Sequence, residues 1–188
     1  MTIDGKAAAD SFPLRPIPES YWVIPGRLLA GETPGVSFSP VATVRRLDAL
    51  LEAGIETLIN LTGQNEIEDY ADLMQERARC YGRWVECLRF PIEDFGLPSN
   101  AQMNEILASI DLALSHERNV YVHCYGGIGR TGTTVGCFLV HQGFTGQQAL
   151  DQLAAWWNNV PKSACHPNSP ETTQQRKFVL GWAALSKL

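Results

Sequence analysis

The stretch YVHCYGGIGRTG, residues 121–132, constrains this chain more than any other part of it. Its apolar start is typical of a buried strand that ends at His123, and glycines dominate the turn that follows. A helical pattern then runs over residues 130–142. A strand, a glycine-rich turn and a helix in this order predict backbone N–H groups that converge at a helix N-terminus. Such a nest binds an anion, and phosphate above all.

One interpretation of this loop is a nucleotide site, because Gly127, Gly129 and Gly132 spell G-x-G-x-x-G. The first glycine of that fingerprint should follow the strand directly, whereas residues 123–126 intervene here. An acidic partner is expected about 20 residues on, but Asp151 lies in a helical pattern. The loop also comes late in the chain, and a Walker loop would need Gly at position 124 and Lys at position 130. The sequence therefore disfavours a nucleotide cofactor.

The second interpretation uses Cys124 and Arg130, which spell C-x5-R around the same glycines. The field at a helix N-terminus favours a thiolate at Cys124. The planar guanidinium of Arg130 matches phosphate oxygens. Alone, the cysteine would most often be a small buried side chain and the arginine half of a surface ion pair. Together at this spacing they predict covalent phosphoryl transfer to sulfur.

The rest of the chain alternates short apolar runs with helical patterns. We expect strands at 21–24, 28–30, 56–61, 84–92 and 120–123. We expect helices at 41–54, 67–81, 100–116, 130–142, 146–158 and 172–187, with Asn100 capping the third. This order predicts an α/β fold in which helices flank a mainly parallel central sheet. Residues 1–19 are expected to form a loose arm and residues 20–188 a single domain.

Composition excludes several classes of protein. A formal net charge of -5 disfavours nucleic-acid binding. No apolar run approaches the roughly 18 residues that span a bilayer, and the first residues do not resemble a secretory signal, so we expect a cytoplasmic protein without membrane contact. Five cysteines, an odd count without a C-x-x-C pair, argue against a disulfide scaffold and against a zinc site.

The segment HCYGGIGRT resembles the signature H-C-x5-R-[ST] of the cysteine-based protein tyrosine phosphatases. It most resembles the compact dual-specificity group and, within that group, the kinase-associated phosphatase type. The resemblance extends from about Tyr21 to Trp182. It implies the dual-specificity phosphatase fold and a phosphocysteine mechanism on Cys124 that uses no metal and no cofactor. The residues implied to bind the substrate phosphate are Tyr125, Gly126, Gly127, Ile128, Gly129 and Arg130.

The resemblance also implies roles outside this loop. In FPIEDFGLPS, Asp94 takes the place of the family's general acid and base, with Glu93 as the neighbouring alternative. In SPETTQQRKF, Gln175 falls where an amide would orient water, and a shift of one residue would select Gln174. Thr131 is expected to donate its hydroxyl to the sulfur.

Two further residues receive structural interpretations. We expect His123 to hydrogen-bond the loop backbone and hold the cysteine in place rather than to act as a base. For Glu66, in the loop after LINL, a solvated loop acid is favoured over an ion pair with a signature-loop arginine.

Members of the resembling family that act on inositol lipids often carry lysines at the loop's variable positions, here 125–129, and no basic residue stands there. The resemblance therefore implies a phosphoprotein substrate rather than an inositol lipid. The chain also lacks a counterpart of the aromatic loop that deepens the pocket of tyrosine-specific members. We therefore expect a shallow pocket for phosphotyrosine that also admits phosphoserine and phosphothreonine, in a monomer. The alternatives are a phosphatase of phosphoinositides or other non-protein phosphomonoesters, and an inactive phosphate-binding module. An arsenate reductase fits less well, because its nucleophile usually lies near the N-terminus.

Overall fold

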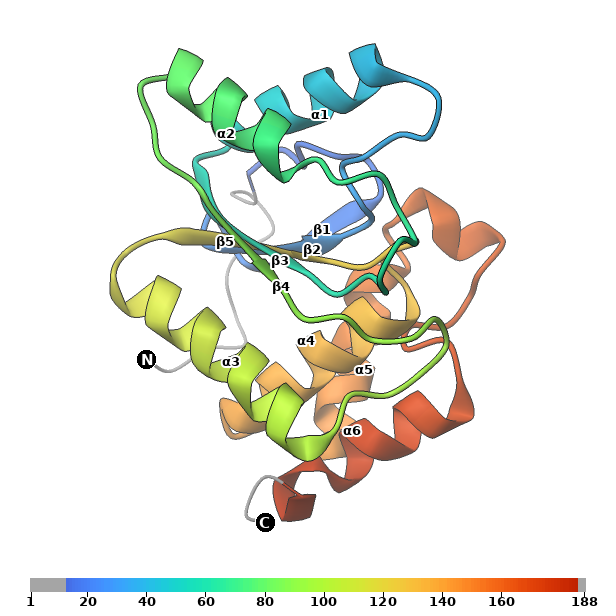
Figure 1. Cartoon of the computed structure of the whole chain (residues 1–188). Coiled ribbons are helices and arrows are strands. Elements are labelled where there is room, and N and C mark those ends of the chain that lie inside the picture. Colours follow the sequence, from blue (N-terminus) through green and yellow to red (C-terminus); the bar gives the residue numbers. More distant parts are fainter. Residues whose placement is uncertain (1–12, 186–188) are drawn as a thin grey trace.

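The computed structural model of the protein describes residues 13–185, which form a five-stranded sheet with helices on both faces (Figure 1). The strand order is β1-β2-β5-β3-β4, and only β1 runs antiparallel to its neighbour. The strands are β1 (Ser20–Ile24), β2 (Leu28–Gly31), β3 (Ile55–Asn60), β4 (Glu86–Arg89) and β5 (Asn119–His123). The predicted α/β fold with a mainly parallel sheet is confirmed.

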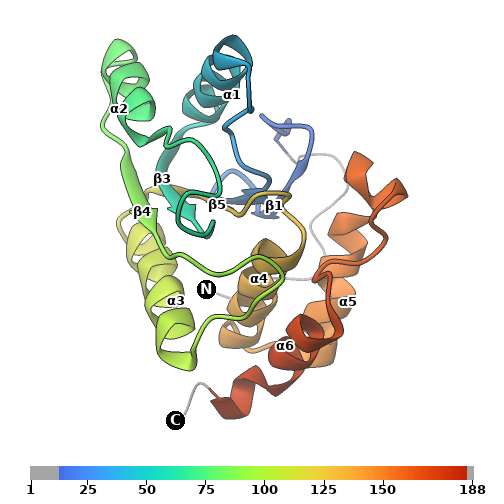
Figure 2. The ribbon, with the colours of Figure 1, turned by 45° about the vertical axis from the view of Figure 1, so that its right-hand side comes forward.

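The helices divide unequally between the two faces of the sheet (Figures 1 and 2). Helices α1 (Pro40–Glu52) and α2 (Ala71–Cys80) cover one face and share a core with Trp22, Leu58 and Tyr121. The other face carries a larger core. Its helices are α3 (Asn100–Ser115), α4 (Gly129–His141), α5 (Gly146–Trp157) and α6 (Thr173–Leu185).

The central strand β5 places the signature loop, residues 124–130, at one edge of the sheet. His123 at its end is in register with Gly31 of β2 on one side and Asn60 of β3 on the other. Because β4 runs parallel to β3, the carboxyl ends of four strands meet at this edge. The loops that follow them gather there, which is where α/β sheets bind ligands.

Helix α4 follows the signature loop directly and is the most buried helix of the protein, with every residue from Gly129 to Val140 buried. Residues without bulky side chains let neighbouring helices approach it closely. A Cβ on Gly136 would lie 2.7 Å from Val179 of α6. The same close packing recurs at the loop itself.

Several element ends differ from the sequence-based expectation. Ser99, not Asn100, caps α3, because its side chain accepts the Gln102 N–H at 3.1 Å. The strand predicted over 84–92 is confined to β4, which pairs with β3 only from Thr57 to Asn60. The helix predicted from residue 67 begins at Ala71, whose N–H is bound by the Asp69 carboxylate.

The predicted boundary between arm and domain at residue 20 falls inside packed chain. Ile17 is fully buried in the core beside α1, and the Trp22 indole donates to the Pro13 carbonyl at 3.0 Å. Burial of Ile17 therefore fixes residues 13–19 on the domain, and residues 1–12 of the predicted arm lie outside the described residues. None of the helices in the described part of the chain is long and apolar enough to cross a membrane.

Candidate active site

A cavity of about 240 Å³ opens at the carboxyl edge of the sheet, with Cys124 and Arg130 in its wall. Its lining comes from three parts of the chain. These are the β4–α3 loop (Asp94, Phe95), the signature loop (Cys124, Tyr125, Gly126, Ile128, Gly129, Arg130) and the segment between α5 and α6 (Lys162, His166, Glu171). The Cys124 residue is only 2% exposed, so its sulfur is reached only through this cavity.

The signature loop is held from outside through its carbonyl groups. The Tyr125 carbonyl accepts the Thr33 N–H at 3.1 Å, and the Ile128 carbonyl accepts the Ser169 hydroxyl at 2.8 Å. The N–H groups of residues 125–128, by contrast, have no acceptor within residues 13–185. Unsatisfied donors at a helix N-terminus are what an anion site requires.

The Arg130 guanidinium is 2% exposed and presents two edges with different partners. Nη1 and Nη2 donate to the two carboxylate oxygens of Glu66, each at 2.6 Å, and Nη1 also donates to the Ile92 carbonyl at 3.0 Å. On the other edge, Nη2 donates to Asp94 Oδ1 at 2.8 Å. The adjacent Nε–H has no acceptor among the described residues. This second edge is the two-donor fork that a phosphate can occupy.

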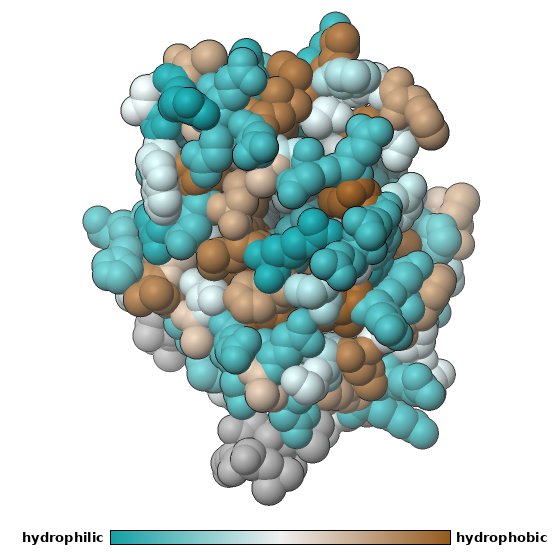
Figure 3. Space-filling model, viewed as in Figure 1, coloured by the Kyte–Doolittle hydropathy of each residue, from teal (hydrophilic) through white to brown (hydrophobic). Residues whose placement is uncertain are grey.

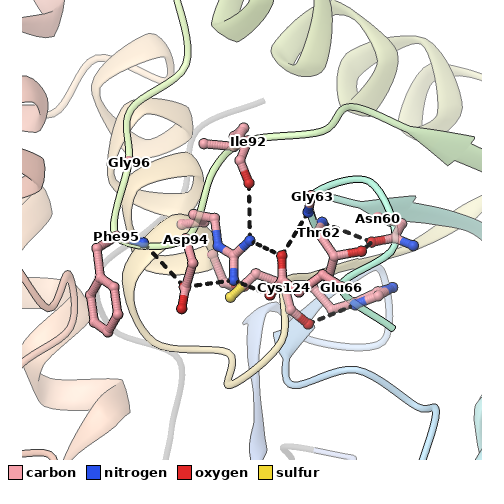
Figure 4. Close-up of polar contacts among 12 residues, drawn as sticks. Asn60, Thr62, Gly63, Glu66, Ile92, Asp94, Phe95, Gly96 and Cys124 are labelled. Atoms are coloured by element: carbon pink, nitrogen blue, oxygen red, sulfur yellow. Dashed lines mark hydrogen bonds and ion pairs between the residues drawn. The ribbon is translucent and has the colours of Figure 1, made fainter. Parts of the chain in front are cut away.

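Glu66 is therefore not the solvated loop acid that the sequence favoured. Asn60 and Thr62 shape the start of the β3–α2 loop, and the Glu66 carboxylate closes it by accepting the Gly63 N–H at 2.7 Å (Figure 4). The Arg130 guanidinium beside it holds the pKa of Glu66 below its ordinary value. The isolated sequence could not show that this loop folds back toward Arg130.

Asp94, the residue predicted to be the acid, lies in the cavity wall, and its neighbour Glu93 does not line the cavity. The Asp94 side chain is 60% exposed, and Figure 4 shows it on the opposite side of the guanidinium from Glu66. It lines the same cavity as Cys124. A tight turn presents it, in which the Gly96 N–H donates to the Glu93 carbonyl at 2.9 Å and Phe95 has a φ of 58°. A left-handed residue other than glycine at such a turn is typical of functional loops.

His123 is fully buried, and burial lowers its pKa to about 4. Burial also raises the pKa of Tyr70, so both groups are uncharged at neutral pH. The Tyr70 hydroxyl then donates to Nε2 of His123, and Nδ1–H of His123 donates to the Cys124 carbonyl at 2.9 Å. The expected hydrogen bond from His123 to the loop backbone is confirmed, and Tyr70 extends it.

The two remaining predicted residues lie beside the loop. The Thr131 hydroxyl donates to the Gly31 carbonyl at 3.4 Å in this structure, not to the sulfur, so a contact with sulfur would require the hydroxyl to reorient. The Gln175 side chain is fully buried and donates to the Gly96 carbonyl at 3.2 Å. A Cβ on Gly129 would lie 2.9 Å from the Gln175 amide, whereas Gln174 is exposed.

Sequence reasoning missed the part of the cavity wall that lies between α5 and α6. Lys162 and His166 stand in a segment without periodic pattern, so no local signal marks them. Glu32 was also missed, and it binds both Arg46, at 2.7 Å, and the Lys162 ammonium. Its place at the carboxyl end of a parallel strand could have identified it.

The rim of the cavity carries exposed aromatic side chains. Phe95 is 56% exposed and Tyr125 is 51% exposed, and both line the cavity. Over the face seen in Figure 3, apolar patches remain small and are separated by hydrophilic side chains. In the described part of the chain, no three His, Cys, Asp or Glu side chains gather in a way that could hold a metal ion.

Comparison with known proteins gives matches along most of the chain. A family model described as PTP-SAK, a Swiss Army Knife protein with a DSP-PTPase phosphatase domain, matches residues 18–179. Among solved structures, that of Tk-PTP in the active form is similar, with a TM-score of 0.69 and 27% sequence identity. The match covers 90% of this chain and 97% of that one.

Two curated relatives are similar over shorter stretches. Cyclin-dependent kinase inhibitor 3 of Sus scrofa is 30% identical over 129 residues, which cover 64% of this chain and 58% of the relative. The phosphatidylinositol 3,4,5-trisphosphate 3-phosphatase and protein-tyrosine-phosphatase PTEN1 of Arabidopsis thaliana is 33% identical over 107 residues, 56% of this chain and 24% of the relative. The matches span less than two thirds of either relative.

Proposed function

Because the chain belongs to the PTP-SAK family of DSP-PTPase phosphatase domains, as its resemblance to the dual-specificity phosphatases predicted, we propose that it hydrolyses phosphotyrosine in proteins, and phosphoserine and phosphothreonine as well. One observation carries this proposal. The sulfur of Cys124 shares a cavity with loop N–H groups that have no acceptor within residues 13–185, and with the Nε–Nη2 edge of a buried arginine, where the exposed Asp94 is the partner. That arrangement can bind a phosphate dianion and direct a thiolate at its phosphorus.

The first half of the reaction transfers the phosphoryl group to sulfur. The phosphate occupies the loop N–H groups and the Nε–Nη2 edge of Arg130, which displaces Asp94 from the guanidinium. The Cys124 thiolate attacks phosphorus, the S–P bond forms, and the bond from phosphorus to the tyrosine oxygen breaks. Asp94, in its acid form, gives its proton to the departing oxygen. Glu66 keeps the other edge of Arg130 occupied and so fixes its direction.

The second half returns the enzyme to its starting state. Asp94, now a carboxylate, takes a proton from a water molecule that attacks phosphorus, and the S–P bond breaks to give phosphate and thiolate. Gln175 stands beside Gly129 and orients that water after its amide leaves the Gly96 carbonyl and the Thr172 N–H. Thr131 stabilises the departing sulfur after its hydroxyl turns away from the Gly31 carbonyl. No step calls for a metal ion.

The rim of the cavity supports a phosphotyrosine substrate. Phe95 and Tyr125 present half-exposed rings at the entrance, where an aryl phosphate would pass between apolar surfaces. A phosphoinositide is the second candidate, because one relative is named for phosphatidylinositol 3,4,5-trisphosphate as well as for protein phosphotyrosine.

A phosphatase assay in EDTA tests the proposal. Wild-type protein, Cys124→Ser and Cys80→Ser are compared on phosphotyrosyl and phosphothreonyl peptides and on phosphoinositide vesicles. Cys80 is an exposed cysteine at the end of α2, outside the cavity, and serves as the matched control. We expect the kcat of Cys124→Ser to fall at least about 10⁴-fold while this variant still binds phosphopeptide. Cys80→Ser should match the wild type.

Three outcomes would contradict the proposal. Equal turnover by wild type and Cys124→Ser would exclude the thiol mechanism. Binding of phosphopeptide without turnover in the wild type would identify an inactive phosphate-binding module. Turnover of the vesicles alone would assign the lipid as substrate.

A further inference from the structure

One part of the cavity wall comes from the turn after α5 and carries two nitrogen-bearing side chains, Lys162 and His166. Lys162 belongs to a short 3-10 helix, Pro161–Ala164, and His166 follows it. The His166 N–H donates to the Lys162 carbonyl at 2.8 Å, so one turn of chain links the two residues. Both side chains line the same cavity as Cys124 and Arg130.

This turn is held in place before any ligand arrives. The Lys162 N–H donates to the Glu19 carboxylate at 3.0 Å, and the Trp157 indole donates to the His166 carbonyl at 2.7 Å. Trp157 and Val160 are each 1% exposed and anchor the turn in the core. Side chains that are already positioned lose little freedom when a ligand binds.

The Lys162 ammonium retains binding capacity. It donates to the Glu32 carboxylate and to the Gly126 carbonyl, the latter at 3.2 Å. An ammonium has three N–H donors, and the third has no acceptor within residues 13–185. Glu32 also binds Arg46 at 2.7 Å, so the Lys162 ammonium shares this carboxylate with a second cation instead of being paired by it alone.

His166 adds a second potential donor and has one acidic neighbour. Its Nδ1 lies 3.9 Å from a carboxylate oxygen of Glu171, and its Nε2 has no partner in the described part of the chain. The side chain is about half exposed, so Nε2 is accessible to a ligand. Lys162 and His166 thus offer an N–H donor and a ring nitrogen beside the phosphate loop.

We propose that Lys162 and His166 form a second anion subsite that binds an acidic side chain next to the phosphotyrosine of a peptide substrate. This inference rests on the proposed phosphatase function and adds a preference for phosphotyrosyl peptides with an acidic flanking residue. Arg130 and the loop N–H groups take the phosphate that is cleaved, and the subsite takes a carboxylate or a second phosphate on a flanking residue.

A peptide fits this pair of sites better than an inositol ring does. The loop positions 125–129 contribute no cation, so among the described lining residues a second anion would meet Lys162 and His166 on the α5–α6 side. The exposed rings of Phe95 and Tyr125 offer apolar contact, which an aryl group uses and a polyol does not. One cationic side and one aromatic rim match a phosphotyrosine with an acidic neighbour.

The test uses matched phosphotyrosyl peptides that carry Glu or Gln in turn at each flanking position. The measured quantity is the ratio of kcat/KM for the Glu peptide over the Gln peptide, for wild type, Lys162→Gln and His166→Gln. We expect a ratio of about fivefold at one position in the wild type, the size of a partly exposed charge pair. The ratio should fall toward one in both variants, and rising salt should reduce it.

The ratio separates recognition from loop structure. Lys162→Gln also removes the contact with the Gly126 carbonyl and can slow both peptides, but a purely structural effect would leave the ratio unchanged. Lys177→Gln is the matched control, because Lys177 is an exposed lysine on α6 outside the cavity lining. It should keep the wild-type ratio.

The possible outcomes have separate meanings. No peptide turnover by the wild type would overturn the proposed function itself. Turnover without preference for Glu at any position, or a preference that survives in Lys162→Gln and His166→Gln, would overturn the subsite while leaving the phosphatase intact. Faster turnover of a soluble inositol bisphosphate than of every peptide, lost in both variants, would assign the second anion to the inositol ring and overturn the peptide preference.

Discussion

The signature loop is held by ion pairs on one side and by close packing on the other. On the side of the β3–α2 and β4–α3 loops, charges do the holding, since Arg130 binds Glu66 and Asp94. On the side of β2 and α6, close packing does it. A Cβ on Gly127 would lie 2.5 Å from the backbone of Gly31, and one on Gly132 would lie 2.2 Å from the Ser169 hydroxyl.

The difference matches what each side must do. An ion pair can exchange partners, so a phosphate can replace the Asp94 carboxylate on the guanidinium without rebuilding the fold. Backbone in contact with backbone cannot yield in that way, because protein interiors are packed as densely as crystals. The packed side therefore fixes where the N–H groups point, and the charged side changes during the reaction.

Gly127→Ala disrupts the close packing of the loop against β2 and should lower activity more than any other substitution considered below. Gly127 has a φ of 75°, which strains any residue with a Cβ, and that Cβ would overlap the backbone at Gly31 and Glu32. The loop must shift, and its N–H groups then miss the phosphate oxygens. We expect kcat/KM for phosphotyrosyl peptide to fall about 10³-fold, with a lower Tm measured alongside.

Gly82→Ala is the matched control for backbone strain. Gly82 has a φ of 65°, but nothing lies within 4 Å of its Cβ position. It should lower Tm and leave kcat/KM unchanged. If Gly127→Ala lowers Tm by the same amount and keeps wild-type activity, the close approach to β2 does not control the loop.

Asp94→Asn tests whether the ion pair on the charged side of the loop gives way to phosphate. Loss of the proton donor should lower kcat about 10²-fold for substrates with poor leaving groups. Inorganic phosphate should bind more tightly as a competitive inhibitor, because the carboxylate that competes for Nη2 of Arg130 is gone. Steady-state inhibition measures both constants in one series.

Glu93→Gln serves as the neighbouring control, since Glu93 is exposed and does not line the cavity. It should retain the wild-type kcat and phosphate inhibition. An unchanged inhibition constant in Asp94→Asn would show that Asp94 does not compete with phosphate in solution, even where kcat falls.

The comparison also explains what the sequence could predict. Cys124, Arg130 and the glycines lie within one stretch of chain, so their joint chemistry can be inferred from local spacing. The parallel sheet follows from alternating strand and helix patterns. Asp94 was predicted as the acid because it takes the place, after a strand, of the acid in the resembling family. The structure brings it into contact with Arg130.

The long-range contacts were not predictable in the same way. Glu66 reaches Arg130 only because β3 and β5 are neighbours whose ends are in register, which no local pattern encodes. Gly129 was expected to admit an anion, yet it makes room for Gln175 of α6, and Gly132 makes room for Ser169 of the segment between α5 and α6. Lys162 reaches the loop from the same distant segment.

Glu66→Gln should have the smallest of these effects and the clearest pH signature. Arg130 keeps the Ile92 carbonyl and Asp94 as partners, and Gln can still accept one hydrogen bond, so kcat/KM should fall only about tenfold. Arg130 lowers the pKa of Glu66 in the folded protein from its ordinary 4.5. The unfolded chain therefore binds more protons at Glu66 just below pH 4.5, and the ionised carboxylate stabilises the fold fully above that pH.

The stability that this carboxylate contributes is lost as pH falls through its lower folded-state pKa. Chemical denaturation of both proteins across pH 3 to 7 measures the difference in unfolding free energy. We expect wild type to be the more stable at pH 7 and its advantage to shrink below about pH 4.5. A difference that stays constant across this range would mean that the contact between Glu66 and Arg130 does not depend on the charge of Glu66. The charged side of the loop would then be held by shape, as the packed side is.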